Sequence, residues 1–313
     1  MISVDDVSLS YDGVRDAVSA LSFTVAPGSI FALVGPNGAG KTSTLRMLAT
    51  LQQPSRGRIR IDGIDAARDA EGARRRVGYL PDNFALYDTM TPVDYLDFFG
   101  RCYEVDDTTR KRRIDALLEE LDLTAKRTAP IRALSRGMRQ RLGVAKTLVH
   151  APKVLLLDEP ASALDPGARM KLRDALLRWK ARGLSIIISS HILPDLAGLA
   201  DAVGIMEGGR MKRAGAIDAL CREGGADARA TYVIELRGNA DKAARVFADF
   251  GPRLGAHREV APGRFEVELD GGPDAVAALV EALVLRGARL SHVAPRESAI
   301  EAVYRKSAAT EVA

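Results

Sequence analysis

Hydrophobic positions along the chain form alternating runs and continuous runs, and each kind predicts a different strand environment. Residues 2–34 alternate apolar with polar positions and end in the run IFALV. This pattern predicts an antiparallel strand pair followed by a buried strand. The runs VLLLDEP (154–160) and SIIISSH (185–191) are continuously apolar. Such runs are typical of central parallel strands that are covered on both faces.

Helical patterns fill much of the chain between these strands. KTSTLRMLATL follows IFALV and its turn, and a longer helical stretch covers residues 91–128. That stretch begins with Thr91 and Pro92, a capping residue followed by proline at the first helical position. We therefore expect an α/β core with an antiparallel β subdomain and a helical subdomain at about residues 84–150.

The last third of the chain repeats none of this pattern. Residues 224–229, GGADAR, predict a linker, and residues 230–313 then follow the order strand, helix, strand, strand, helix, strand, with a short helix after them. This order is typical of a small ferredoxin-like α+β domain. The chain of 313 residues should thus hold a nucleotide-binding domain at residues 1–223 and an accessory domain at residues 230–313.

Composition narrows the classes of function. The formal charge is only +4, and arginines alternate with acidic residues along the whole chain, which argues against a nucleic-acid groove. Cys102 and Cys221 are far apart and form no CxxC pair, so we expect reduced thiols and no zinc site. No apolar run approaches the ~18 residues that a membrane span needs. Any membrane role should therefore depend on a partner.

The segment GPNGAGKT matches the P-loop pattern and lies between a predicted strand and a predicted helix. Its glycines let successive backbone N–H groups turn inward and bind phosphates, Lys41 adds a positive charge, and Thr42 offers a hydroxyl to Mg²⁺. The predicted ATP-binding residues are Gly35, Pro36, Asn37, Gly38, Ala39, Gly40, Lys41, Thr42 and Ser43.

Two adjacent carboxylates end the apolar run VLLLDEP. Because ligands of open α/β sheets bind at the carboxyl ends of the strands, both should lie beside the phosphates. We expect Asp158 to hold Mg²⁺, together with Thr42, and Glu159 to orient and deprotonate the attacking water.

A second helix start, in the segment ALSRGMRQRLG, also has the features of an anion site. Ser135 can cap the helix, Gly137 permits close approach to the backbone, and a basic run follows. A single nucleotide site does not need two such helix starts, so the residues alone leave its role open.

The order of GPNGAGKT, LSRGMRQR, VLLLDEP, SALD and SSH resembles the ATP-binding subunits of ABC transporters, over about residues 2–222. The resemblance implies a head-to-tail dimer, in which the signature helix of one subunit faces the γ-phosphate held by the other. Within this family, the chain is most similar to the ATPases of drug-resistance-type exporters, because a βαββαβ tail follows a single cassette.

The resemblance also implies roles for single residues. Tyr11 would stack on adenine, Ser135 and Gly137 would contact the partner subunit's nucleotide, and Asp165 would lie at the dimer interface. His191 would reach the γ-phosphate and hold Glu159 and the water in line. Two of these residues have an ordinary structural alternative, which is strand-end packing for Tyr11 and strand capping for His191.

Two motifs depart from the family pattern. The signature usually reads LSGGQ, whereas Arg136 and Met138 replace the first glycine and the glutamine here. Gly137 is retained, so we expect the contact to the nucleotide to survive. Asp82 stands where the family usually has glutamine, and it is predicted either to bind Mg²⁺ through water or to cap a turn.

Aromatic residues are concentrated in NFALYDTMTPVDYLDFF, at positions 83–99. Most should pack in the helical subdomain, and some should be exposed as a patch for another protein, since the family's membrane permease docks in this region. We therefore expect an ATP hydrolase on the cytoplasmic side of the membrane, working with a second ATP-binding subunit and a permease in export. The alternatives are a soluble mechanochemical ABC ATPase and a regulatory module that does not hydrolyse ATP.

Overall fold

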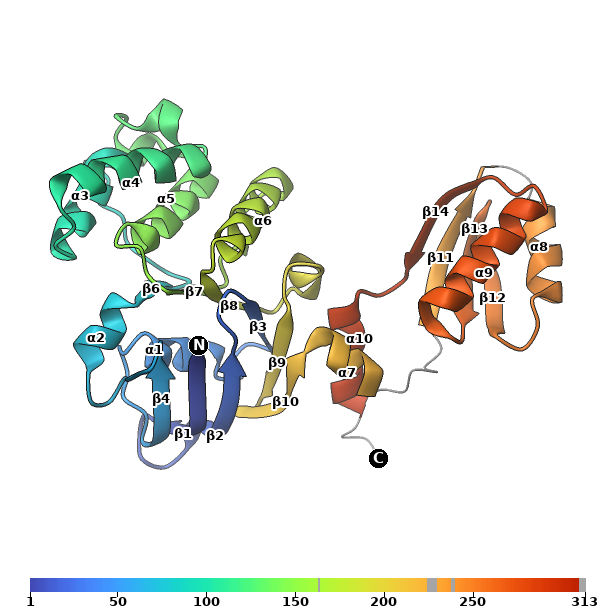
Figure 1. Ribbon diagram of the computed structural model, residues 1–313, viewed down its shortest axis with the longest axis horizontal. Helices are drawn as coiled ribbons and strands as arrows, with labels where there is room; N and C mark the ends of the chain where they lie inside the picture. The colour runs from blue at the N-terminus through green and yellow to red at the C-terminus, as the bar shows by residue number, and fades with distance from the viewer. Residues whose placement is uncertain (163, 224–229, 238–239, 310–313) are drawn as a thin grey trace. The chain divides into compact units, whose positions relative to one another are not determined.

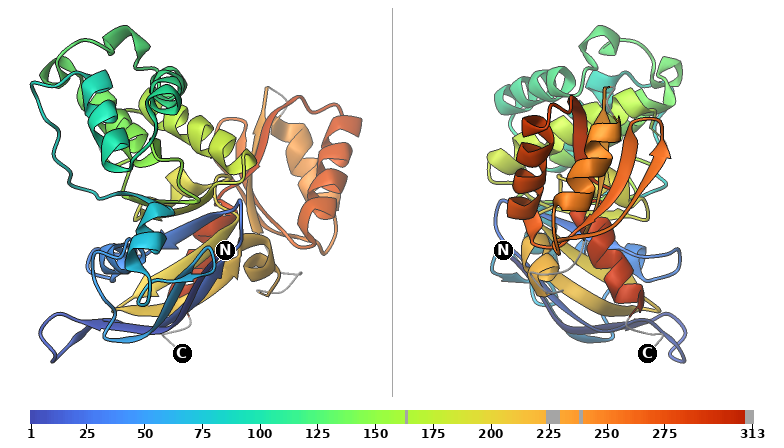
Figure 2. Two further views of the ribbon diagram at one scale, coloured as in Figure 1. Left: turned by 60° about the vertical axis from the view of Figure 1, so that its left-hand side comes forward. Right: turned by 90° about the vertical axis from the view of Figure 1, so that its right-hand side faces the viewer.

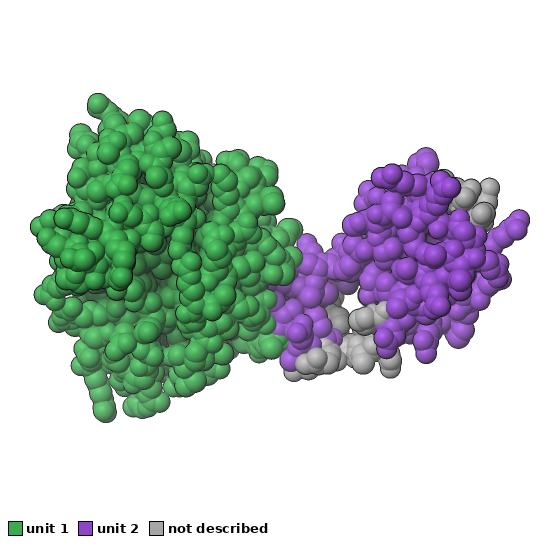
Figure 3. Space-filling model, turned by 45° about the horizontal axis from the view of Figure 1, so that its top comes forward, with its two compact units in different colours: residues 1–216 green, residues 217–313 purple. Residues whose placement is uncertain are grey.

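The computed structural model describes residues 1–162, 164–223, 230–237 and 240–309. The chain forms two compact units, Met1–Ala216 and Ile217–Ala313, which Figure 3 colours separately. The predicted linker at residues 224–229 lies outside the described residues.

The first unit is an α/β structure with two sheets (Figure 1). Its strands are β1 (Ile2–Ser10), β2 (Asp16–Val25), β3 (Ile30–Val34), β4 (Arg56–Ile61), β5 (Ile64–Asp65), β6 (Val77–Leu80), β7 (Val154–Asp158), β8 (Ser185–Ser190), β9 (Ala202–Glu207) and β10 (Arg210–Ala216). The helices in this unit are α1 (Lys41–Leu48), α2 (Ala70–Arg75), α3 (Pro92–Cys102), α4 (Asp107–Glu120), α5 (Arg136–Leu148) and α6 (Pro166–Ala181), and the 3-10 turns are η1 (Thr124–Lys126), η2 (Ile131–Ala133) and η3 (Leu193–Leu196).

The central sheet has the order β10-β9-β3-β8-β7-β6, with parallel pairing from β9 to β6 and an antiparallel edge at β10. Every residue of β3, β7 and β8 is buried, as the continuously apolar runs predicted. The hairpin between β9 and β10 turns at Gly208 and Gly209, whose φ angles of 53° and 79° suit glycine.

The second sheet, β2-β1-β4-β5, is antiparallel. Its apolar face packs on the central sheet, and the Phe23 ring of β2 stacks on Phe31 of β3 with 4.9 Å between centroids. This arrangement confirms the predicted antiparallel β subdomain beside the α/β core.

Helices α3, α4 and α5 gather at one end of the first unit (Figures 1 and 2). The predicted start of α3 is confirmed, because Thr91 accepts a hydrogen bond from the Asp94 N–H and Asp94 bonds back to Thr91. Within this group α5 also contacts β6, which joins the helices to the central sheet.

The second unit contains a small sheet and four helices among its described residues. The strand order is β12-β13-β11-β14, and every pair is antiparallel. Helices α8 and α9 cover one face of this sheet (Figure 2), while α7 packs against α10. Its elements are α7 (Ile217–Glu223), β11 (Ala230–Leu236), α8 (Ala240–Asp249), β12 (Leu254–Ala261), β13 (Arg264–Leu269), α9 (Gly272–Leu285), β14 (Leu290–Pro295) and α10 (Ala299–Ala309).

The helices can be compared with the length and the apolar character of a membrane span. Within the described part of the chain, none combines the length and the apolar character that a membrane span requires.

Candidate nucleotide site

The loop between β3 and α1 is shaped by its glycines. At Gly35 a Cβ would collide with the backbone oxygen of Met206, and at Gly40 it would lie 2.8 Å from the Ala17 oxygen. Gly38 and Gly40 also have φ angles of 82° and 97°, which larger residues rarely adopt. Helix α1 begins directly after Gly40, so its free N–H groups face the loop. The sequence GPNGAGKT therefore folds as the expected anion cradle.

Lys41 is the cation of this cradle and is only 6% exposed. Its Nζ donates hydrogen bonds to the oxygens of Gly35 at 2.7 Å and Pro36 at 3.1 Å. The ammonium group is thereby held under the loop, where a bound phosphate would lie. A buried cation of this kind favours a negatively charged ligand.

Asp158 and Glu159 leave β7 at the same end of the sheet. Asp158 is fully buried, and its Oδ1 accepts a hydrogen bond from the Ser189 hydroxyl at 2.6 Å. The same hydroxyl accepts the Glu159 N–H at 3.0 Å. Glu159 has a φ of 47°, a left-handed conformation that costs a glutamate of order 1 kcal/mol and is often found at functional sites.

The Glu159 carboxylate lies between two partners. Its Oε2 is 2.9 Å from His191 Nδ1, and its Oε1 is 3.7 Å from Lys41 Nζ. Because a carboxylate accepts, the proton of this hydrogen bond is on His191 Nδ1, which leaves Nε2 for another contact. The histidine therefore holds one carboxylate oxygen and leaves the other available.

Lys41 and Glu159 line a cavity of 250 Å³, whereas Asp158 and His191 are not part of its lining. The strand end at Ala17, the P-loop, Asp82 and Glu159 line it. Asp82 therefore lies where an ion in the cavity could reach it, although its carboxylate also accepts a hydrogen bond of 3.4 Å from the neighbouring Asn83. The P-loop residues of the lining are Asn37, Gly38, Ala39, Gly40, Lys41, Thr42 and Ser43.

Tyr11 lies beside the same loop. Its hydroxyl is 3.0 Å from the Ser43 hydroxyl, and the residue is 57% exposed. An exposed ring held at the start of α1 offers a flat face to a ligand, and its stacking on adenine stays a prediction.

The helix start at Ser135 contributes no described residue to the lining of this cavity. Ser135 caps α5 by accepting the Met138 N–H at 3.3 Å, as the sequence predicted. A Cβ placed on Gly137 would lie 3.6 Å from the Leu164 side chain and 3.9 Å from Asp165 Oδ2. Asp165 in turn caps α6 through the Ala168 N–H. The structure thus brings the signature helix and the SALD segment together, apart from the P-loop cavity.

Unpartnered polar atoms test whether the cavity suits MgATP. Among the described residues, Glu159 Oε1 of the cavity lining and Oδ2 of the adjacent Asp158 are buried without a hydrogen-bond partner, as is the Tyr79 hydroxyl, which lines a different cavity. Burial, aided by the charge of Asp158, raises the pKa of Tyr79 to about 12, so this hydroxyl stays protonated. Two carboxylate oxygens without a hydrogen bond suit a hydrated Mg²⁺, and a buried lysine beside a glycine loop suits phosphates. The residues present therefore fit the nucleotide and its metal.

Comparisons with known proteins identify the family of this chain. Residues 18–162 match the family model described as ABC transporter. The daunorubicin resistance ATP-binding protein DrrA3 of Streptomyces coeruleorubidus is 32% identical over 303 residues, which cover 97% of this chain and 94% of that protein. The chain belongs to the ABC transporter ATP-binding proteins. Its P-loop NTPase fold and its role as the ATP-binding subunit of an ABC transporter follow from this membership.

Other ABC proteins extend the likeness. The linearmycin resistance ATP-binding protein LnrL of Bacillus subtilis is 31% identical over 227 residues, 72% of this chain and 73% of that protein. A solved structure of an ATP-binding subunit of an ABC transporter has a TM-score of 0.67 at 31% identity and covers 72% of this chain and 93% of its own. The dimeric structure of the cassette MJ0796 has a TM-score of 0.63 at 22% identity, over 69% of this chain and 98% of its own, and supports the fold alone.

Ser189 belongs to the SSH motif, but the sequence assigned it no role beside the acidic residues. The parallel register of β7 and β8 places Ser189 opposite Asp158, so one hydroxyl orders both acidic residues. The only signal in the sequence is a pair of serines at the end of an apolar strand, where a polar side chain at a covered position needs a partner.

Proposed function

We propose that this ABC subunit hydrolyses MgATP between two cassettes and thereby powers export through a separate membrane permease. The observation that carries the hydrolytic part is the pairing of Glu159 with His191 beside a P-loop cavity. Phosphate release from MgATP by the purified chain tests this assignment, and it should depend on Glu159.

The chain's own residues divide the work of hydrolysis. The P-loop amides and Lys41 bind the phosphates, and Thr42 and Asp158 would hold Mg²⁺, which neutralises phosphate charge when bound. Glu159 Oε1 is free to accept the proton of an attacking water, while His191 fixes the other carboxylate oxygen. We include Asp82 as a further oxygen ligand reached through water.

Gly137 supports the proposal that two subunits share each nucleotide. Its backbone is helical, and the space around it would accept a Cβ at ordinary van der Waals distance. Nothing described within the chain therefore requires glycine here. A ligand that approaches the backbone closely from outside would require a glycine at this position. The γ-phosphate held by a second copy of the chain would be such a ligand. Ser135 and Asp165 lie at the same place and would join this contact.

Export is inferred from relatives. Proteins similar over most of this chain are named for resistance to daunorubicin and to linearmycin. We propose that this subunit likewise belongs to an exporter, and that it is held at the cytoplasmic face of the membrane by its permease.

The proposed permease contact is the aromatic patch, which we define as Tyr87 and Phe98. These side chains are 53% and 44% exposed and meet edge to face at 6.2 Å, whereas neighbouring Tyr95 is 1% exposed and belongs to the core. Exposed aromatic pairs of this kind commonly anchor protein interfaces.

Charge introduced into the patch should release the subunit from membranes. With Tyr87→Glu and Phe98→Glu together, co-expression with the permease should leave most of the protein in the supernatant, because a buried unpaired carboxylate opposes docking. ATP binding should be unchanged. Val260→Glu, at an exposed apolar position of the second unit, serves as the control. Sedimentation with membranes measures the result, and undiminished membrane association of the double variant would contradict the assignment.

We further propose that the second unit is a ferredoxin-like accessory domain that is dispensable for chemistry. The nucleotide cavity is built from residues of the first unit alone. A chain that ends after Ala216 should therefore bind ATP with an affinity within a few-fold of the full chain, while its dimerisation weakens. Equilibrium titration with a fluorescent ATP analogue measures this. A folded truncation without ATP binding would contradict the domain division.

A further inference from the structure

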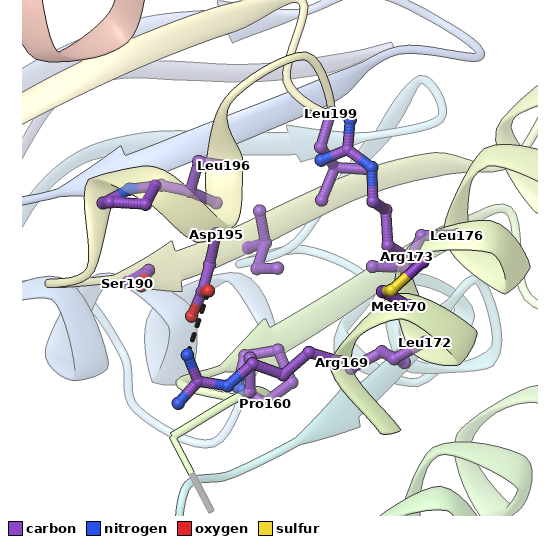
Figure 4. A pocket seen from close by; sticks show the side chains of 13 residues that line it. Pro160, Arg169, Met170, Leu172, Arg173, Leu176, Ser190, Asp195, Leu196 and Leu199 are labelled. Atoms are coloured by element: carbon purple, nitrogen blue, oxygen red, sulfur yellow. Dashed lines mark hydrogen bonds and ion pairs between the residues drawn. The ribbon is translucent and has the colours of Figure 1, made fainter. Parts of the chain in front are cut away.

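A second cavity, of 160 Å³, is lined by residues next in sequence to Glu159 and His191 (Figure 4). Pro160 and Ala161, which follow Glu159, line one side, and Ser190, which precedes His191, lines another. Most of the remaining lining is apolar and comes from α6 and the segment after β8. The two chain segments that carry the proposed catalytic pair are therefore separated here by space rather than by packed side chains.

One ion pair bridges the two sides of this cavity. Arg169 of α6 donates from Nη1 to Asp195 Oδ1 of η3 at 3.2 Å, as the dashed line in Figure 4 marks. The same guanidinium donates from Nε to the Leu164 oxygen at 3.1 Å. The two side chains are 35% and 17% exposed, so the pair is partly shielded from water. We call Arg169 and Asp195 the clasp.

On the Glu159 side, the clasp is connected to the carboxylate by hydrogen-bonded turns. The backbone carbonyl oxygen of Glu159 accepts hydrogen bonds from the Ser162 N–H at 3.2 Å and from the Ser162 hydroxyl at 2.9 Å. The Ala161 oxygen then accepts the Leu164 N–H at 3.2 Å, and the Leu164 oxygen is the atom that Arg169 binds.

On the histidine side, the connection is equally short. The Asp195 N–H donates to the Ile192 oxygen at 3.3 Å, and Ile192 follows His191 directly. His191 returns to Glu159 through the hydrogen bond between Nδ1 and Oε2. The contacts therefore form a closed ring, with the catalytic pair on one side and the clasp on the other.

We propose that Arg169 and Asp195 are positioning residues for hydrolysis, and that the clasp keeps His191 and Glu159 in contact. This inference rests on the proposed hydrolytic role of Glu159. Asp195 Oδ2 is buried without a partner among the described residues, so Arg169 is the cation that compensates this carboxylate. Without Arg169 the carboxylate turns toward water, η3 follows it, and the histidine leaves its bonding distance to Glu159.

Steady-state kinetics of clasp variants in the full-length protein test this role. Arg169→Met and Asp195→Asn should each lower kcat about tenfold or more, because small displacements of catalytic groups are costly. KM for ATP should stay within about twofold, since the P-loop is untouched. Arg169→Lys should lie between wild type and Arg169→Met, because an ammonium keeps the charge but lacks the fork that serves two acceptors.

The matched control is Arg127→Met. Arg127 forms an ion pair of 2.7 Å with Asp115 in the helical group and is 44% exposed. This variant loses a similar ion pair but leaves the ring of contacts between the clasp and Glu159 intact. Its kcat should therefore equal that of the wild type. Thermal unfolding identifies any clasp variant that fails to fold. If Arg169→Met fails to fold, the kcat of Asp195→Asn, which is nearly isosteric with the wild type, tests the positioning role.

Epistasis with Glu159 separates positioning from a general loss of structure. In a Glu159→Gln background, Asp195→Asn should cause no further fall in the slow residual turnover, because the clasp acts through the carboxylate. Unchanged kcat in both clasp variants, a loss confined to KM, or a full additional loss in the Glu159→Gln background would each overturn the clasp. A wild-type chain that releases no phosphate would instead overturn the proposed function.

Discussion

Glu159→Gln should bind ATP with wild-type affinity and should release phosphate about two to four orders of magnitude more slowly. The amide keeps the shape of the side chain but has no charge and cannot take a proton from water. Lys41 and the P-loop, which we propose bind the phosphates, are unchanged. The loss should therefore appear in kcat and not in the dissociation constant for ATP.

The same variant should accumulate as an ATP-bound dimer, because hydrolysis no longer removes the nucleotide that joins the two subunits. Size-exclusion chromatography in MgATP measures the dimer, and a coupled assay measures phosphate. Glu119→Gln, an exposed glutamate of α4, is the control and should match the wild type in both assays. Phosphate release by Glu159→Gln at the wild-type rate would exclude Glu159 as the base.

Sequence patterns predicted the parts of this site that depend on local order. GPNGAGKT carries its glycines at the positions where the backbone must turn or approach another segment, so the residues alone were enough to recognise the loop. The buried strands β7 and β8 were likewise visible as continuous apolar runs, and the start of α5 at Ser135 as a capping residue.

The contacts that organise the acidic residues were not predictable in this way. Ser189 bridges Asp158 and Glu159 only because the register of β7 against β8 places it there, and Ser189 lies 30 residues beyond Glu159 in the chain. Arg169 and Asp195 are 26 residues apart, and charged residues are too frequent in this chain for the pairing to stand out. Such partners are far apart in the sequence and are brought together only by tertiary structure, so a sequence pattern does not identify them.

The aromatic residues at 83–99, which look alike in the sequence, differ in burial in the structure. The aromatic stretch at 83–99 was expected to be mostly core with some exposed members, but the pattern did not say which. The structure buries Tyr95 and exposes Tyr87 and Phe98. The short strand β6, only four residues long, was not predicted, because VGYL is too brief to show a period.

Mixing two inactive variants should restore ATP-driven dimerisation if the signature helix acts on the partner's nucleotide. One variant carries Lys41→Ala and an intact signature. The other carries an intact P-loop and Gly137→Glu, which places a negative side chain where the γ-phosphate would approach. Because a Cβ at Gly137 meets its neighbours at 3.6 Å, the second variant should fold normally. Neither variant alone can form a complete site.

In the mixture, roughly half of the dimers should be mixed if the affinities are equal. Each mixed dimer then holds one complete site, formed by the intact P-loop of one subunit and the intact signature of the other, and one site with both defects. ATP-dependent dimerisation, measured by light scattering, is the primary measurement, because cooperativity between the two sites could silence hydrolysis even when the geometry is correct.

If the signature helix instead acts within its own subunit, mixing cannot restore a site, since every subunit in the mixture still carries one defect. A mixture as inactive as its parts would therefore place Ser135 and Gly137 outside the partner's site. Recovery would mean that the second helix start, which one subunit alone does not need, completes the nucleotide site of the other.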